Sequence, residues 1–233
     1  MKKHLFVVAH PDDEVLGAGA FIFEATRRGD QVAVAVLNTC DTTRYEKDTS
    51  QILGDMMKSH AILSTPENKI KLFPFGYIDS NFNSADHRKM VQDIEGVIED
   101  FRPDAIFTQH PGDINTDHYW TAASCMEAFH LWQRLRGYSR PIEALYLMEV
   151  QSSTDWALNP SEKRFCPNTF VEVSQEAVQA KVNALSVYEN VIRPVPHPRS
   201  KEALMALPVL RGAQSGVPLA EAFECVFRKA ADL

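Results

Sequence analysis

Leu5-Phe6-Val7-Val8-Ala9-His10-Pro11-Asp12-Asp13-Glu14 is the stretch that decides how the rest of the chain is interpreted. Its apolar first half is typical of a buried strand, and a segment typical of an amphipathic helix follows it. One acid at a helix start is favoured by roughly 0.3–1 kcal/mol, but a helix start does not explain three acids and an imidazole. Open α/β sheets bind their ligands at this strand-to-helix edge. We therefore interpret the cluster as a candidate metal site with one carboxylate left over as a base.

Composition limits what the protein binds. The chain has 233 residues, of which 45% are hydrophobic and 24% are charged, as in an ordinary globular domain. Its formal net charge of −7 argues against nucleic acid or an anionic membrane surface as the main partner. No apolar run approaches the ~18 residues that span a bilayer, so we expect no membrane insertion.

The N-terminus and the cysteines indicate the compartment. The apolar run after the basic N-terminus is too short for a signal peptide. The four cysteines lie far apart without a CxxC pair, which favours free thiols in a reducing compartment over disulfides or a cysteine zinc site. We therefore expect a cytoplasmic protein.

Strand-like and helix-like segments alternate through the first two thirds of the chain. The expected strands are Leu5–Ala9, Gln31–Leu37, Ile70–Phe73, Ala105–Thr108 and Glu143–Glu149. The expected helices are Glu14–Arg28, about Arg44–Leu63, Asp86–Phe101 and Thr116–Arg136. The last third is less regular, with strands near Thr169–Val173 and Glu224–Phe227 and helices near Gln175–Ser186 and Lys201–Leu207. This alternation predicts right-handed βαβ units and an α/β fold with a parallel, doubly wound sheet.

The second polar cluster, His110-Pro-Gly-Asp-Ile-Asn-Thr-Asp-His118, also follows a predicted strand. Asn115 or Thr116 would cap the next helix, which places Asp117 and His118 in its first turn. The carboxyl ends of parallel strands meet at one edge, so this loop is expected beside the first cluster.

Together the two loops supply a ligand set. Catalytic zinc usually takes three protein ligands from His and Asp/Glu, and we infer the triad His10, Asp13 and His118, with Asp12 free to act on a water. Glu14 alone could be only a helix-start acid, and His118 alone a surface or core histidine. The clusters together favour a site, because helix caps do not require histidines on two loops of one edge.

These residues resemble the PIG-L family of zinc-dependent de-N-acetylases, also called LmbE-like. The resemblance is carried by Ala9-His10-Pro11-Asp12-Asp13-Glu14 and Asp113-Ile-Asn-Thr-Asp-His118, with weaker support from Gly76-Tyr-Ile-Asp79-Ser-Asn81 and Arg211-Gly212…Gly216…Ala220-Glu221-Ala222-Phe223. It implies a Rossmann-like, mostly parallel sheet with helices on both faces, in one domain over residues 1–233. The core would be about 1–150, and an irregular part, 151–233, would complete the site.

The resemblance also implies roles. It makes His10, Asp13 and His118 the ligands of one zinc ion and Asp12 the general base, and it places Arg44 and Asp79 where family members contact substrate. The implied reaction is hydrolysis of an acetyl amide on an N-acetylglucosaminyl compound or a related amide. The implied partner is a small N-acetylated sugar or glycoconjugate, and a homo-oligomer stays open.

The chain departs from the family at Asn115, where many members have a histidine that stabilises the transition state. Asn115 can donate a hydrogen bond to an oxyanion but cannot act as a general acid near neutral pH. His197, in the loop Arg193-Pro-Val-Pro-His-Pro-Arg199, or His110 is expected to replace it. We prefer His197 because its flanking prolines would hold it stiffly, although a solvated loop histidine is an equal interpretation.

Other classes of protein fit less well. Gly17-Ala-Gly19 lies inside the expected helix and lacks the third glycine of a nucleotide-binding GxGxxG motif. No GxSxG elbow of a serine hydrolase is present. A metal-binding or carrier protein without hydrolytic activity remains the alternative, because Asn115 departs from the family.

Overall fold

The computed structural model describes residues 1–40, 48–136, 139, 141–158 and 163–229. Its strands are β1 (Lys3–Val8), β2 (Gln31–Val36), β3 (Lys71–Pro74), β4 (Ala105–Gln109), β5 (Ala144–Met148), β6 (Thr169–Glu172) and β7 (Ala220–Arg228). Its helices are α1 (Asp13–Arg27), α2 (Thr49–Leu63), α3 (His87–Phe101), α4 (Thr116–Arg136), α5 (Gln175–Leu185) and α6 (Lys201–Ser215), with a 3₁₀ turn η1 (Phe82–Ser84). No helix in this described part is long and apolar enough to cross a membrane.

All seven strands form one sheet in the order β3-β2-β1-β4-β5-β7-β6. The first five are parallel, and β7 runs antiparallel to both of its neighbours. The chain winds outward from β1 to β3 and then resumes at β4 on the other side of β1, so the topological switch point lies between β1 and β4. The prediction of a doubly wound, mostly parallel sheet in a single α/β domain is confirmed.

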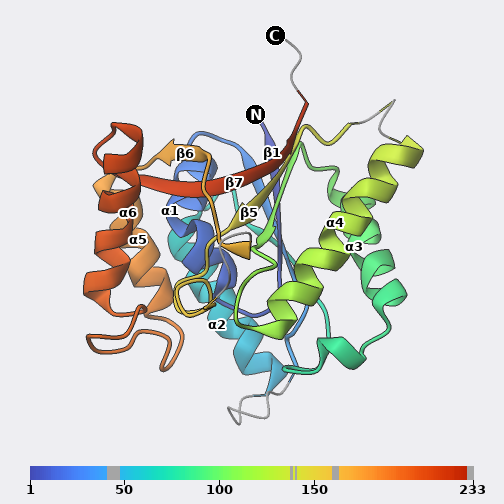
Figure 1. Cartoon of the computed structure of the whole chain (residues 1–233), viewed down its shortest axis with the longest axis horizontal. Helices are drawn as coiled ribbons and strands as arrows, with labels where there is room; N and C mark the ends of the chain where they lie inside the picture. Colours follow the sequence, from blue (N-terminus) through green and yellow to red (C-terminus); the bar gives the residue numbers. More distant parts are fainter. Residues whose placement is uncertain (41–47, 137–138, 140, 159–162, 230–233) are drawn as a thin grey trace.

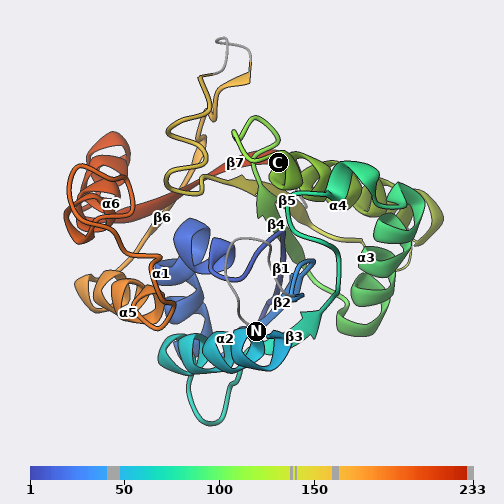
Figure 2. The same cartoon turned by 90° about the horizontal axis from the view of Figure 1, so that it is seen from below.

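Helices cover both faces of the sheet (Figure 1, Figure 2). Phe6 and Val8 of β1 pack into a core shared with α1, α2 and α5, whereas Leu5 and Val7 pack into a second core with α3 and α4. All four side chains are fully buried. Strand positions buried in apolar cores on both faces favour apolar residues, which is why the Leu5–Val8 part of β1 appears in the sequence as an apolar run.

The C-terminal third differs from its predicted bounds. The helix expected to end at Leu207 continues through the buried Pro208 to Ser215, and Gly216 terminates it in the left-handed conformation with φ of 80°. The strand expected at Glu224–Phe227 runs from Ala220 to Arg228 and includes the buried Glu221. A charged residue argues against a buried strand unless it is paired, and a pairing partner is not visible in the sequence.

That partner is Lys181 of α5, and the pair supports α1. Lys181 Nζ lies 2.7 Å from Glu221 Oε1, and both side chains are almost fully buried. Helix α1 is interrupted at Ala18, which has φ of −149°. The Glu221 carboxylate accepts hydrogen bonds from the freed backbone N–H groups of Ala20 and Phe21 at 3.2 and 2.7 Å. The ion pair therefore caps the second half of the helix that begins at the candidate site.

Candidate active site

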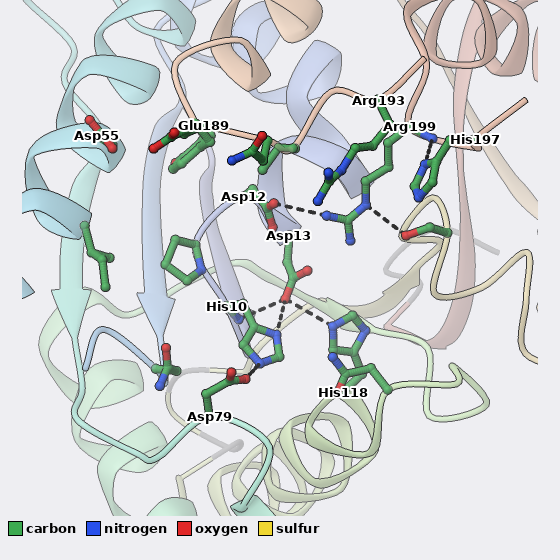
Figure 3. A pocket seen from close by; sticks show the side chains of 18 residues that line it. His10, Asp12, Asp13, Asp55, Asp79, His118, Glu189, Arg193, His197 and Arg199 are labelled. Carbon is green, nitrogen blue, oxygen red and sulfur yellow. Dashed lines mark hydrogen bonds and ion pairs between the residues drawn. The ribbon is translucent and has the colours of Figure 1, made fainter. Parts of the chain in front are cut away.

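The candidate site is a pocket of about 550 Å³ at the carboxyl ends of β1 and β4 (Figure 3). Its lining comes from the loops after the five parallel strands β1 to β5, from the first turns of α1 and α4, from α2, and from the segment between α5 and α6. The two polar clusters expected at one edge therefore do meet there. They do so at the switch point, where the loops after β1 and β4 diverge and leave a crevice.

The loop after β1 holds its residues in a constrained conformation. Asp12 is the residue before α1 and has φ of 97°, and its carboxylate does not cap the helix. Ser152 and Asn190, which also line the pocket, have positive φ angles of 76° and 62°. Non-glycine residues with positive φ are uncommon and costly, and they concentrate where a site requires a particular orientation. The backbone thus turns the Asp12 side chain toward the pocket and away from its helix.

His10, Asp13 and His118 are brought together as predicted. Their donor atoms lie within 4.8 Å of one another. Asp13 Oδ2 is 3.5 Å from His10 Nδ1 and 3.4 Å from His118 Nε2. Two imidazole nitrogens and one carboxylate oxygen form the donor set of many catalytic zinc sites. The chemistry and spacing of these side chains fit a divalent metal.

Each histidine of this group has a carboxylate behind it. His118 Nδ1 lies 2.8 Å from Asp113, which also accepts a hydrogen bond from the Thr154 hydroxyl at 2.7 Å. His10 Nε2 lies 3.1 Å from Asp79 Oδ1. Such outer carboxylates fix the tautomer of a ligating histidine and leave the other ring nitrogen free for the metal. The structure thus places Asp79, which was predicted to bind substrate, at the pocket wall and against His10.

Asp117 also contacts His10, but its carboxylate mainly anchors a loop. Asp117 Oδ2 lies 3.3 Å from His10 Nε2. The same carboxylate accepts backbone hydrogen bonds from Ser80 at 2.6 Å and from Phe82 at 3.2 Å. Asp117 therefore anchors the loop that carries Asp79 onto the start of α4, and its oxygens are already occupied.

Burial and neighbouring charges shift the pKa values of several pocket residues. Burial alone would raise the pKa of Asp13, but His118 and His10 beside it bring that pKa well below its usual range. Burial would lower the pKa of His118, and the facing carboxylates of Asp13 and Asp113 raise it to about 9. In Asp12 burial dominates and raises the pKa to about 7, although Arg199 pulls it down. A carboxylate with a pKa near neutrality is well matched to general base chemistry.

Asn115 takes the capping role predicted for it or for Thr116. Its Oδ1 accepts a hydrogen bond from the backbone N–H of Asp117 at 2.9 Å, at the start of α4. This bond fixes which end of the amide faces the helix and leaves the Nδ2 donor for another partner. Asn115 also lines the pocket.

The two candidate replacement histidines are in different places. His197 lines the pocket, and its Nδ1 accepts a hydrogen bond from the backbone N–H of Arg199 at 2.9 Å. Burial, with Arg199 and Arg193 nearby, lowers the pKa of His197, so the neutral ring carries its proton on Nε2. His110 lines a separate cavity of about 510 Å³, beside Arg211.

The sequence did not predict two residues of the site, Arg199 and Gln109. Arg199 donates from Nη1 to Asp12 at 3.3 Å, and its Nε contacts the Ser152 hydroxyl at 2.9 Å. Gln109, the last residue of β4, donates to Asp13 at 2.8 Å. Gln109 could have been found, because it ends a strand at the predicted edge. Arg199 gives no such signal, since its position depends on how an irregular loop folds.

Glu14, Gly17 and Gly19 lie outside the pocket lining. Arg44 lies outside the described residues. Glu14 does not face the pocket: it is fully buried and its Oε1 lies 2.7 Å from His60 of α2. Gly17 and Gly19 serve packing, because a Cβ on them would meet Met148 at 3.0 Å and Lys181 at 2.9 Å.

Fold and site together define a Rossmann-like α/β protein with a His/Asp set that could hold a metal ion at the carboxyl edge of its sheet. The chain belongs to the PIG-L family, described as GlcNAc-PI de-N-acetylase, whose family model matches residues 5–129. This confirms the resemblance and indicates a deacetylase. A comparison with curated proteins found no match.

Solved structures with this fold include a deacetylase and a hydratase. N,N'-diacetylchitobiose deacetylase from Pyrococcus horikoshii has a TM-score of 0.73 at 19% identity, over 97% of this chain and 84% of that one. The conserved protein TT1542 from Thermus thermophilus has a TM-score of 0.75 at 21% identity, over 100% and 98%. GalB, the 4-carboxy-2-hydroxymuconate hydratase from Pseudomonas putida KT2440, has 0.73 at 18%, over 100% and 99%. These likenesses show the fold, which alone does not determine the reaction.

Proposed function

We propose that the protein is a metal-dependent de-N-acetylase that hydrolyses the acetyl amide of an N-acetylglucosaminyl-type sugar or a related amide. The observation that carries this proposal is the convergence of His10, Asp13 and His118 in one pocket, with Asp12 beside them and outside the ligand set. Membership of the PIG-L family supports the same reaction.

His10, Asp13 and His118 would hold one metal ion, and we propose zinc. The two-imidazole, one-carboxylate donor set supports zinc, and the carboxylates of Asp79 and Asp113 would orient the ligating rings. A bound divalent metal supplies Lewis-acid polarisation of the acetyl carbonyl and a lowered pKa for water.

Asp12 is proposed as the general base. Its carboxylate is buried, turned toward the pocket by a positive φ angle, and held by Arg199. It takes the proton from the attacking water and afterwards delivers a proton to the departing amine. A buried base next to the metal ligands can do both without exchanging its proton with bulk solvent.

Asn115 and His197 are proposed as oxyanion donors. The amide nitrogen of Asn115 and the protonated Nε2 of His197 are neutral donors in the pocket lining. A neutral donor suits an oxyanion because it needs no change of protonation state before or after the step. Because His197, Arg199 and Ser152 all follow residue 150, we propose that the part from 151 to 233 completes the site of one domain spanning 1–233.

We also propose which residues contact the substrate, what the substrate is and where the protein works. Asp79 lines the pocket and would contact substrate through its carboxylate while it supports His10. Arg44 would also contact the substrate, as the family resemblance implies. The partner would be a small N-acetylated sugar or glycoconjugate. The four free cysteines support a cytoplasmic location. The protein could also form a homo-oligomer.

A second candidate is a metal-binding or carrier protein of the same fold without hydrolytic activity. The observation that favours it is Asn115, which stands where many members have a catalytic histidine and which here caps α4. Such a protein would bind metal and a sugar but would not release acetate.

Acetate release tests the proposal. The metal-loaded protein is incubated with N-acetylglucosamine and with an N-acetylglucosaminyl glycoside, beside chelated protein and the Asp12→Asn variant. We expect acetate and a free amine from the metal-loaded wild type alone, with the Asp12→Asn variant still binding metal. Metal binding without acetate release from any N-acetylated sugar would favour the carrier protein instead.

A further inference from the structure

Two arginines meet at the base of the loop between α5 and α6. The backbone N–H of Arg193 donates to the carbonyl of Arg199 at 3.1 Å and closes the loop between them. Three prolines within this loop, at positions 194, 196 and 198, fix its φ angles. Both arginine side chains line the pocket, on the wall that also carries His197 (Figure 3). The loop therefore presents two guanidinium groups to the pocket from a stiff backbone.

The two guanidinium groups differ in their partners. Arg199 contacts Asp12 at 3.3 Å, the Ser152 hydroxyl at 2.9 Å and the backbone carbonyl of Gln151 at 3.1 Å. Arg193 has no hydrogen-bond or ion-pair partner for its side chain among the residues that the structure describes. Its charge is therefore available to a ligand in the pocket.

Four acids of the pocket have partners other than Arg193. Asp12 is paired with Arg199, Asp13 with the two histidines, and Asp79 with His10. Asp55, on the opposite wall in Figure 3, is paired with Lys58. The wall at Arg193 therefore carries a positive charge that these four acids do not neutralise.

We propose that Arg193 binds an oxyanion of the substrate, a phosphate or a carboxylate, so that the preferred substrate is an anionic N-acetylated sugar. The substrate class rests on the proposed function, whereas anion binding by Arg193 does not. A guanidinium offers a planar fork of donors that matches either oxyanion. The proline-rich loop holds the backbone of Arg193 in advance, which reduces the entropy lost on binding.

Binding to the metal-loaded protein tests the anion site without any need for turnover. The probes are glucosamine, glucosamine 1-phosphate, glucosamine 6-phosphate and muramic acid, which carry no acetyl group to remove. We expect at least one anionic probe to bind about 5- to 20-fold more tightly than glucosamine by calorimetry, the size of a partly solvated charge-assisted hydrogen bond. The phosphate and carboxylate probes distinguish the two sources of the oxyanion.

Variants assign that preference to one side chain. Arg193→Gln should remove it and Arg193→Lys should keep part of it. Arg88→Gln, at an exposed arginine of α3 outside the pocket, should leave it unchanged. Arg193 is exposed, so these variants should fold normally, and a melting curve checks this. A preference that persists in Arg193→Gln, or no preference for any anionic probe, overturns the proposal.

Turnover separates this inference from the proposed function. The N-acetylated forms of the same four probes should show the same ratio in kcat/KM for acetate release. Acetate release without an Arg193-dependent preference overturns the anion site alone. An Arg193-dependent binding preference without acetate release leaves the anion site standing and refutes the deacetylase.

Discussion

Arg199 Nη1 lies 3.3 Å from Asp12 Oδ2, although 187 positions separate the two residues in the chain. Asp12 is buried, and its burial raises its pKa to about 7 while Arg199 lowers it. The carboxylate works as a base only when it has lost its proton, so the rate should rise as pH increases through this pKa.

Replacing Arg199 should therefore shift the pH profile. In Arg199→Gln the stabilising positive charge is gone, the pKa of Asp12 rises, and the acid limb of kcat/KM moves to higher pH. A bound metal lowers this pKa in both proteins, so the difference between them persists. Arg199→Lys should restore most of the wild-type profile. An Arg199→Gln profile that superimposes on the wild-type one would show that Arg199 does not act on Asp12.

The carboxylate behind His118 should control metal affinity. Asp113→Asn removes the charge 2.8 Å from His118 Nδ1, and outer partners of this kind typically contribute 10- to 100-fold, so we expect a loss of about that size. The metal dissociation constant, measured by competition with a chelator, is the readout. Asp100→Asn, at an exposed carboxylate paired with Lys71, is the control. Equal affinities in the two variants would contradict the assigned role of Asp113.

Asn115 and His197 can be distinguished by their separate effects on rate. Loss of an oxyanion donor elsewhere costs about 10²–10³ in kcat, and the residue that acts as donor here should show a defect of that size. Neither Asn115→Ala nor His197→Ala should change the metal content, because neither residue belongs to the ligand set. If both variants keep wild-type kcat, neither side chain stabilises the oxyanion.

The Lys181–Glu221 pair should matter for stability far more than its distance from the metal ligands suggests. Glu221→Gln leaves Lys181 buried without a counter-charge and should cost about 3–5 kcal/mol in the free energy of unfolding. Glu143→Gln breaks the exposed Lys2–Glu143 pair and should cost no more than about 1 kcal/mol. Urea denaturation compares the two, and similar costs would refute the buried role.

The sequence was sufficient to predict the fold and the convergence of His10, Asp13 and His118, for physical reasons. Positions buried in apolar cores on both faces of a sheet favour apolar residues, so the Leu5–Val8 part of β1 could be recognised in the sequence. Parallel strands expose their carboxyl ends at one edge, so loops that follow β1 and β4 had to meet, and His10 and His118 with them.

The structural features that the sequence did not predict depend on contacts between distant segments of the chain. Arg199 reaches Asp12 from an irregular loop whose path no periodicity encodes. Glu221 can be buried in β7 because Lys181, 40 positions earlier in the chain, lies beside it. The part of α6 beyond Pro208 was not predicted, because proline usually ends a helix. Here the helix continues past Pro208 and packs against β7.

The central claim is that His10, Asp13 and His118 hold a catalytic metal. Its most direct test is the metal content per chain of the wild type and of His118→Ala, purified in parallel without added metal and then again after zinc addition. The account predicts about one zinc in the wild type, which His118→Ala loses while it stays folded. No metal in the wild type even after zinc addition, or equal zinc in both proteins, would contradict it.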